Sequence, residues 1–132
     1  MKMLDWVSLI FFNSWNKINC LYIELMAIQT ITDENFEEKV MKSSKLFLIR
    51  FTAEWCGPCK ALAPIVEEIS NEMSDVEFGV LDVDSEPNSP IRPEFSVRGI
   101  PSCFLVKSGS VVGSKIGMTN KQDFVSWIKE NI

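Results

Sequence analysis

Two cysteines separated by two residues, Cys56 and Cys59, have a spacing that could do chemistry. Residues three apart share a face of a helix, so the two sulfur atoms could join as a small disulfide or stand open as a dithiol. If Cys56 lies at a helix N-terminus, the unpaired N–H groups and the helix dipole there favour its thiolate. Cys59 would lie one turn inside and be shielded. The pattern predicts one sulfur that attacks a disulfide and a second that resolves the product.

The residues around the pair suit this turn. Gly57 lets the backbone turn tightly, and Pro58 gives up an N–H that has no partner in a first helical turn. Trp55 would form an apolar platform beside the first cysteine, or would simply be a partly buried aromatic residue. Lys60 follows the pair directly and is a possible modulator of its chemistry.

Two other interpretations of the pair are a zinc site and two unconnected core cysteines. Zinc needs two further ligands, which Cys20 and Cys103 could supply only by accident. We therefore expect no metal. We expect Cys103 to fill space in the core.

Length and composition narrow the class of protein. The chain has 132 residues, of which 46% are hydrophobic and 23% charged, which suits one packed domain. The net charge of −5 argues against a nucleic-acid partner, because no basic surface would displace counterions from phosphates. The absence of histidine excludes Cys-His and Ser-His catalytic sites. Four cysteines with one close pair are not a secreted disulfide framework, so we expect intracellular redox chemistry.

Residues 1–27 read as an N-terminal extension ahead of a domain over residues 28–132. The apolar run from Trp6 to Phe12 is shorter than the roughly 20 residues that span a membrane. Asp5 and the lack of a small-residue cleavage site argue against a signal peptide. Met26 would make a plausible start, which would make the first 25 residues an artefact of start-site choice. A signal or a docked helix is the alternative.

The rest of the chain alternates helical and extended patterns. Pro64 lies inside the helix that follows the cysteine pair and should kink it. The predicted elements, in order, are a helix from Thr32 or Asp33 to Ser43, a strand over 46–51, a helix over 57–74, a strand over 76–83, a short helix over 93–96, a hairpin of 102–107 with 111–116, and a last helix capped by Thr119 or Asn120. This order predicts an α/β domain with a parallel crossover followed by an antiparallel hairpin.

Several motifs resemble those of the thioredoxin family. The stretch Phe51–Lys60 closely resembles the family's active-site segment, and Val97–Ser102 resembles the loop in which a cis peptide bond precedes proline. The segments 107–109 and 115–117 match the family's hairpin turn and the glycine after it. The resemblance covers Gln29–Ile132. It implies the thioredoxin fold, with a central mixed sheet of four to five strands flanked by about four helices.

The resemblance also implies a function. The expected activity is that of a thiol–disulfide oxidoreductase, a soluble dithiol reductant of protein disulfides that carries no cofactor. An NADPH-dependent thioredoxin reductase would recharge it, and disulfide-bearing client proteins would be its substrates. We expect a cytoplasmic monomer. In this scheme the first cysteine attacks, the second resolves, and Gly57 and Pro58 tune the redox potential.

The proline loop has an expected role in the same scheme. Pro101, if cis, would pack against the cysteine pair, while Gly99 and Ile100 would offer their backbone to an extended client peptide. An ordinary trans turn proline is the alternative. Two other functions stay open: an exported or membrane-anchored disulfide-exchange protein, and a non-catalytic binding subunit with this fold. Gly57 and Pro58 between the cysteines favour the reductant.

The chain departs from the family at Arg50. The family usually carries a buried aspartate six residues ahead of the first cysteine, with a lysine nearby at the position that is Val80 here. A guanidinium cannot act as a general base, and burying it unpaired is costly. Asp82 on the adjacent strand is the candidate partner. If Arg50 lies near Cys59 it should favour that thiolate and raise the reduction potential; otherwise it snorkels, or Asp82 neutralises it.

Overall fold

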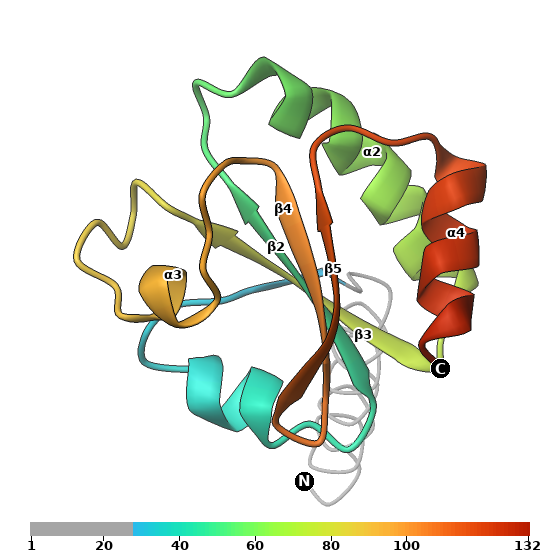
Figure 1. Cartoon of the computed structure of the whole chain (residues 1–132), viewed down its shortest axis with the longest axis horizontal. Coiled ribbons are helices and arrows are strands. Elements are labelled where there is room, and N and C mark those ends of the chain that lie inside the picture. The colour runs from blue at the N-terminus through green and yellow to red at the C-terminus, as the bar shows by residue number, and fades with distance from the viewer. Residues whose placement is uncertain (1–27) are drawn as a thin grey trace, which may run out of the picture.

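A five-stranded mixed sheet forms the centre of the molecule (Figure 1). The computed structural model describes residues 28–132, so the predicted N-terminal extension and Cys20 lie outside the described residues. The strand order is β1-β3-β2-β4-β5. β2 and β1 pair parallel with β3, whereas β4 pairs antiparallel with β2 and β5. The strands are β1 (Ile28–Thr30), β2 (Leu46–Thr52), β3 (Val76–Asp82), β4 (Ser102–Lys107) and β5 (Ser110–Ile116).

Helical segments cover both faces of the sheet. The segments are η1 (Glu37–Met41), α2 (Gly57–Glu72), α3 (Ile91–Glu94) and α4 (Lys121–Glu130). α2 and α4 lie side by side over one face, while η1 and α3 lie over the other (Figure 1). The predicted thioredoxin-type α/β architecture is therefore confirmed. No helix among residues 28–132 is long and apolar enough to cross a membrane.

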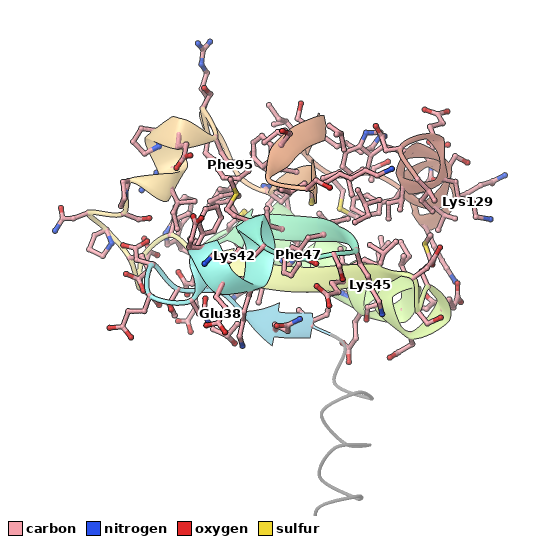
Figure 2. All side chains as sticks on the ribbon, turned by 90° about the horizontal axis from the view of Figure 1, so that it is seen from below. Glu38, Lys42, Lys45, Phe47, Phe95 and Lys129 are labelled. Carbon is pink, nitrogen blue, oxygen red and sulfur yellow. A yellow bond between two sulfur atoms is a disulfide. The ribbon has the colours of Figure 1, made fainter. Side chains whose placement is uncertain are left out.

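Strand alternation builds two cores, one on each face. On β2, Phe47, Ile49 and Phe51 point toward η1 and α3, where aromatic rings dominate the packing. Figure 2 shows Phe47 beside η1 and Phe95 beside α3, whereas Lys129 on α4 lies at the outside. The opposite core, under α2 and α4, consists mainly of aliphatic residues: Leu46, Leu48, Leu62, Val66, Ile69, Met73, Val76, Leu105 and Ile128. Both faces of β2 are buried, as its near-continuous apolar sequence predicts.

The first helical segment differs from its prediction. Thr32 closes the turn ahead of the segment rather than capping the segment, whose N-cap is Phe36: the Thr32 N–H donates to Asn35 Oδ1 at 2.8 Å, and Thr32 Oγ1 accepts from Asn35 N at 3.4 Å. However, the segment closes as a short π-helical turn, in which Lys42 N donates to Glu37 O. Asp33, the other proposed cap, instead accepts a hydrogen bond from Ser89 Oγ at 2.5 Å.

The remaining boundaries agree closely with the sequence patterns, with two exceptions. α3 spans Ile91–Glu94, earlier than the predicted 93–96, and β1 was not predicted. α2 continues through Pro64. Of the two proposed caps for α4, Asn120 has the role, since its Oδ1 accepts from Asp123 N at 2.8 Å.

Candidate active site

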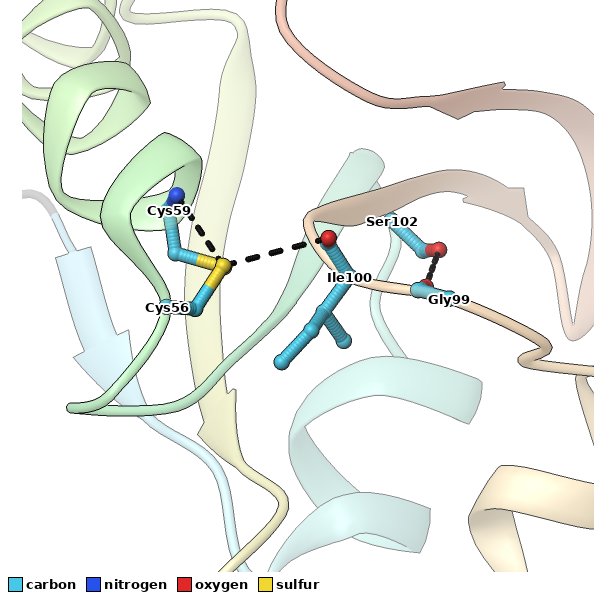
Figure 3. The surroundings of a disulfide bond; sticks show 5 residues. All are labelled: Cys56, Cys59, Gly99, Ile100 and Ser102. Atoms are coloured by element: carbon cyan, nitrogen blue, oxygen red, sulfur yellow. Dashed lines mark hydrogen bonds between the residues drawn. A yellow bond between two sulfur atoms is a disulfide. The ribbon is translucent and has the colours of Figure 1, made fainter.

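The two paired cysteines lie where β2 gives way to α2. Cys56 has an extended backbone and caps the helix that begins at Gly57, with Pro58 in the first turn. Cys56 and Cys59 are joined by a disulfide, and their Cα atoms are 5.2 Å apart. Cys59 N lies 3.2 Å from Cys56 Sγ and donates a hydrogen bond to it (Figure 3). The helix N-terminus therefore directs an N–H group at one sulfur only, which favours negative charge on that sulfur.

The two sulfurs differ in access. Cys56 is 5% exposed and Cys59 1%. Gly57 and Pro58 are exposed, and Trp55 is 71% exposed. Lys60 is exposed as well, and its ammonium forms no ion pair with any described residue. Both cysteines are thus buried, Cys56 the less so, and the exposed surface around them comes from their neighbours in the chain.

A loop before β4 faces the disulfide. The Ile100–Pro101 peptide bond is cis, and Ile100 O lies 3.8 Å from Cys56 Sγ (Figure 3). Ser102 Oγ donates a hydrogen bond to Gly99 O, which closes the loop on itself. Pro101 is buried, whereas Gly99 is exposed and Ile100 half-buried. The structure thus brings the Gly99–Pro101 loop and the cysteine pair together, although they are more than 40 residues apart in sequence.

The end of β5 adds residues that the sequence analysis did not assign to the site. Gly117 N donates to Pro101 O at 2.8 Å, and Ile116 pairs with Ser102 across the sheet. Ile116 is 65% exposed, and Met118 is also exposed. In the sequence, the apolar residues on either side of Gly117 could have indicated an exposed binding surface. The sequence does not show, however, that this segment hydrogen-bonds to the proline loop.

Arg50 does not have the partner predicted for it. It lies opposite Val80 and Cys103 in the sheet, whereas Asp82 lies opposite Thr52. Asp82 Oδ1 instead accepts from Asp84 N at 2.9 Å, because the short carboxylate turns back onto its own backbone where β3 ends. Arg50 forms no ion pair with any described residue. The Asp82 prediction is therefore wrong.

Arg50 is instead a buried cation. Its side chain is 7% exposed, and its Nε is enclosed without a hydrogen-bond partner among the described residues. Burial lowers the pKa of Arg50, since a charged guanidinium loses hydration there. The stem and Nε are therefore enclosed, whereas the two terminal nitrogens are not among the buried, unpartnered atoms, so the alternative in which the side chain snorkels stays open.

Cys103 faces the same core as Arg50. It is a free thiol and is buried. Burial raises the pKa of Cys103 to about 12, against the smaller lowering effects of Arg50 and Lys115. This thiol therefore stays protonated at ordinary pH. The expected core position is confirmed, and no group of three or more metal-ligating side chains occurs within residues 28–132.

Comparison with known proteins agrees with this geometry. The family model described as thioredoxin matches residues 27–130. The chain belongs to the thioredoxin family. A thioredoxin of Acidithiobacillus ferridurans is 40% identical over 107 residues, which cover 80% of this chain and 97% of that protein. A thioredoxin of Buchnera aphidicola subsp. Acyrthosiphon pisum (strain APS) is 44% identical over 103 residues, covering 77% and 94%.

Family membership and the cysteine pair together give the activity. The protein is a thiol–disulfide oxidoreductase that reduces protein disulfides with a dithiol, as thioredoxins do. Disulfide-bearing proteins in general are its substrates. The chemistry needs only two sulfur atoms that can alternate between a dithiol and a disulfide.

Proposed function

We propose that Cys56 is the attacking thiol and Cys59 the resolving thiol. The hydrogen bond from Cys59 N to Cys56 Sγ is the observation that supports this assignment most strongly. It stabilises negative charge on Cys56 at the helix N-terminus, and the thiolate is the form that attacks disulfides. Cys59 is the more buried of the two, which suits it to the second, intramolecular attack on Cys56.

The cycle conserves electrons and sulfur atoms. The Cys56 thiolate attacks one sulfur of a client disulfide, a mixed disulfide forms, and the other client sulfur leaves as a thiolate. The Cys59 thiolate, which has lost its proton to water, then attacks Cys56 Sγ. The Cys56–Cys59 bond forms, the second client sulfur leaves, and both client thiolates take protons from water. The client is reduced by two electrons and this protein is oxidised by two.

We propose that the Gly99–Pro101 loop holds the client during these steps. Ile100 is half-buried and its carbonyl lies beside Cys56 Sγ, so an extended client segment could pair with this backbone as an added strand. Trp55 supplies an exposed apolar face next to the attacking cysteine. Gly57 and Pro58 shape the turn between the sulfurs and so tune the reduction potential.

We propose further that an NADPH-dependent thioredoxin reductase regenerates the dithiol, and that a monomer works in the cytoplasm. The use of cysteine supports this compartment, since one close pair does not resemble a secreted disulfide framework. Cell fractionation tests the proposed compartment, because recovery in an exported or membrane fraction would favour the anchored alternative.

Residues 28–132 are proposed as the working domain, and N-terminal sequencing of the native protein would show whether residues 1–25 precede it.

Insulin reduction with NADPH and a bacterial thioredoxin reductase tests the proposed roles. We expect the parent protein to consume NADPH and precipitate the insulin B chain. We expect Cys56→Ser and Cys59→Ser each to abolish turnover, whereas Cys103→Ala serves as a matched cysteine control and retains it. Turnover by Cys56→Ser would contradict the assignment. If the double variant kept the protein's biological role in cells, the binding-subunit alternative would be favoured.

A further inference from the structure

Arg50 is a buried cation that has no counter-charge among residues 28–132, and it lies on the sheet face covered by the helix that carries the cysteine pair. Arg50 is nine-tenths buried, and no described carboxylate lies within ion-pair distance of it. Its Nε has no hydrogen-bond partner among the described residues. An isolated charge in a protein interior is unfavourable unless an opposite charge compensates it. This raises the question of which group on that face could become negative.

Strand alternation places Arg50 on the α2 face of the sheet. Leu46 and Leu48 point into the core beneath α2 and α4, and Arg50 is the next position in that series. Its neighbours on this row are Val80 of β3, Cys103 of β4 and Lys115 of β5. Val80 cannot ionise, Lys115 is a second cation, and burial keeps Cys103 protonated. Within the described strands, no anion on this row therefore faces Arg50.

The helix above supplies the remaining candidate. α2 links the parallel strands β2 and β3, so it runs antiparallel to β2 over this face. The two elements cover similar lengths of this face: the distance along β2 from Leu46 to Arg50 is about 13 Å. The distance along α2 from Cys59 to Ile69 is about 15 Å, and the helix runs in the opposite direction. The first buried residue of α2, Cys59, therefore lies at the same end of the sheet as Arg50, although its side chain packs with Cys56 and Ala53 in the core that η1 and α3 cover.

We propose that Arg50 stabilises the thiolate of Cys59 after the disulfide opens. This inference rests on the proposed roles of Cys56 and Cys59. Among residues 28–132, the charged or ionisable groups nearest Arg50 by this reasoning are Cys59 at the start of α2, Cys103 of β4 and Lys115 of β5. Asp82 of β3 binds its own backbone, and the acids of α2 that reach α4, Glu68 and Glu72, bind Lys121 at the exposed surface.

This arrangement assigns Arg50 a positioning role that differs from proton transfer. A guanidinium cannot accept the Cys59 proton, so the proton passes to water and the positive charge holds the thiolate that remains. That thiolate then attacks Cys56 Sγ, forming the Cys56–Cys59 bond and releasing the client sulfur. Because the reduced form is stabilised, the disulfide gains electrons more readily. The reduction potential is therefore higher than it would be with a neutral residue at position 50.

Two measurements on full-length variants test the proposal, with Cys20→Ser in every protein so that one bystander thiol is removed. The first is the redox equilibrium with glutathione. We expect Arg50→Met to shift the equilibrium toward the disulfide by about tenfold at a pH above the pKa of Cys59, which corresponds to about 30 mV for this couple, and by less at lower pH, where the thiol is protonated in both proteins. Arg50→Lys should retain most of the parent value. Arg92→Met, which removes the same charge from α3 on the other face, should leave it unchanged.

The second measurement is the pKa of the Cys59 thiol, followed by thiolate absorbance in a Cys56→Ser background, where the two sulfurs cannot titrate as a coupled pair. We expect Arg50→Met to raise this pKa by about one unit, as a tenfold loss of thiolate stability requires. Adding Cys103→Ala should leave the shift in place, which shows that Arg50 does not act through the buried thiol. Arg50→Gln provides a second neutral variant if Arg50→Met does not fold.

The outcomes separate this inference from the proposed function. If the parent exchanges with glutathione but neither the equilibrium nor the Cys59 pKa changes in Arg50→Met and Arg50→Gln, the inference is wrong and the proposed function stands. A shift that disappears with Cys103→Ala also overturns it. If the parent itself never exchanges through Cys56 and Cys59, the proposed function fails and this inference fails with it.

Discussion

The buried thiol of Cys103 makes a quantitative prediction about stability at alkaline pH. Its pKa is raised from an ordinary value of 9.0 to about 12 because the folded core offers a thiolate no hydration. A group whose pKa is higher in the folded state contributes stability that is complete below its unfolded pKa and lost as pH rises toward the folded one. The unfolding free energy should therefore decrease above pH 9, as the unfolded chain gains the thiolate.

The magnitude follows from the two pKa values. Between pH 8 and pH 10 the unfolded thiol ionises almost completely while the folded one stays protonated, which integrates to about one pKa unit, or about 1.4 kcal/mol. Burial lowers the pKa of Arg50 and its two carboxylate partners raise the pKa of Lys121, but both groups are present in the parent and in a Cys103→Ala variant, so a comparison of the two isolates the thiol. The disulfide form should be used, because Cys56 and Cys59 then do not titrate.

Urea unfolding of the oxidised parent and of Cys103→Ala at pH 8 and pH 10 measures this quantity. The cavity left by the substitution lowers the unfolding free energy of the variant by the same amount at both pH values. The change in unfolding free energy from pH 8 to pH 10, compared between the parent and the variant, therefore gives the contribution of the thiol alone. We expect the parent to lose about 1.4 kcal/mol more than the variant over this interval. Equal losses in the two proteins would show that Cys103 ionises as easily in the folded chain as in the unfolded one, which would refute the argument from burial.

Three further predictions follow from local geometry. Gly79→Ala should destabilise the fold by about 1–3 kcal/mol in urea unfolding, because a Cβ there would lie 2.8 Å from the Phe47 ring; an unchanged midpoint would contradict this. Asn120→Ala should cost about 1 kcal/mol by removing the cap on Asp123 N, and Asn120→Asp should restore most of it; equal loss in both would argue against capping. Trp55→Ser should raise the KM for insulin severalfold but leave the rate with a small aromatic disulfide unchanged, and a parallel loss with both substrates would exclude a role in holding protein clients.

Most of the sheet could be predicted because its elements carry strong local signals. β2 is apolar except at Arg50 and Thr52, α2 begins at a Gly-Pro turn after a cysteine, and both hairpin strands flank a glycine turn. The π-type turn of η1 could not be predicted, because the apolar residues Phe36 and Val40 are four positions apart. This spacing is the same whether the last turn closes with an α-helical or a π-helical hydrogen bond. β1 has only three residues, too few for a periodic pattern, and it is held by pairing with β3.

The site was predictable where its residues are adjacent in the chain and less so where folding brings them together. Cys56, Cys59 and the proline loop were found from motifs, and the structure shows them in contact. Ile116 was missed because its proximity to the loop depends on the register of β4 and β5. Asp82 was wrongly paired with Arg50, since strand alternation gives the face of a side chain but not the backbone turn that it caps.

The most direct test of the account is a trapping experiment with a disulfide-containing client. Reduced Cys59→Ser should accumulate a mixed disulfide with insulin, and mass spectrometry of the digested adduct should locate the link at Cys56. The account predicts that Cys56→Ser forms no such adduct and that dithiothreitol releases the client from the trapped one. An adduct linked through Cys59 or Cys103, or equal trapping by both variants, would contradict the claim that the sulfur at the helix N-terminus makes the attack.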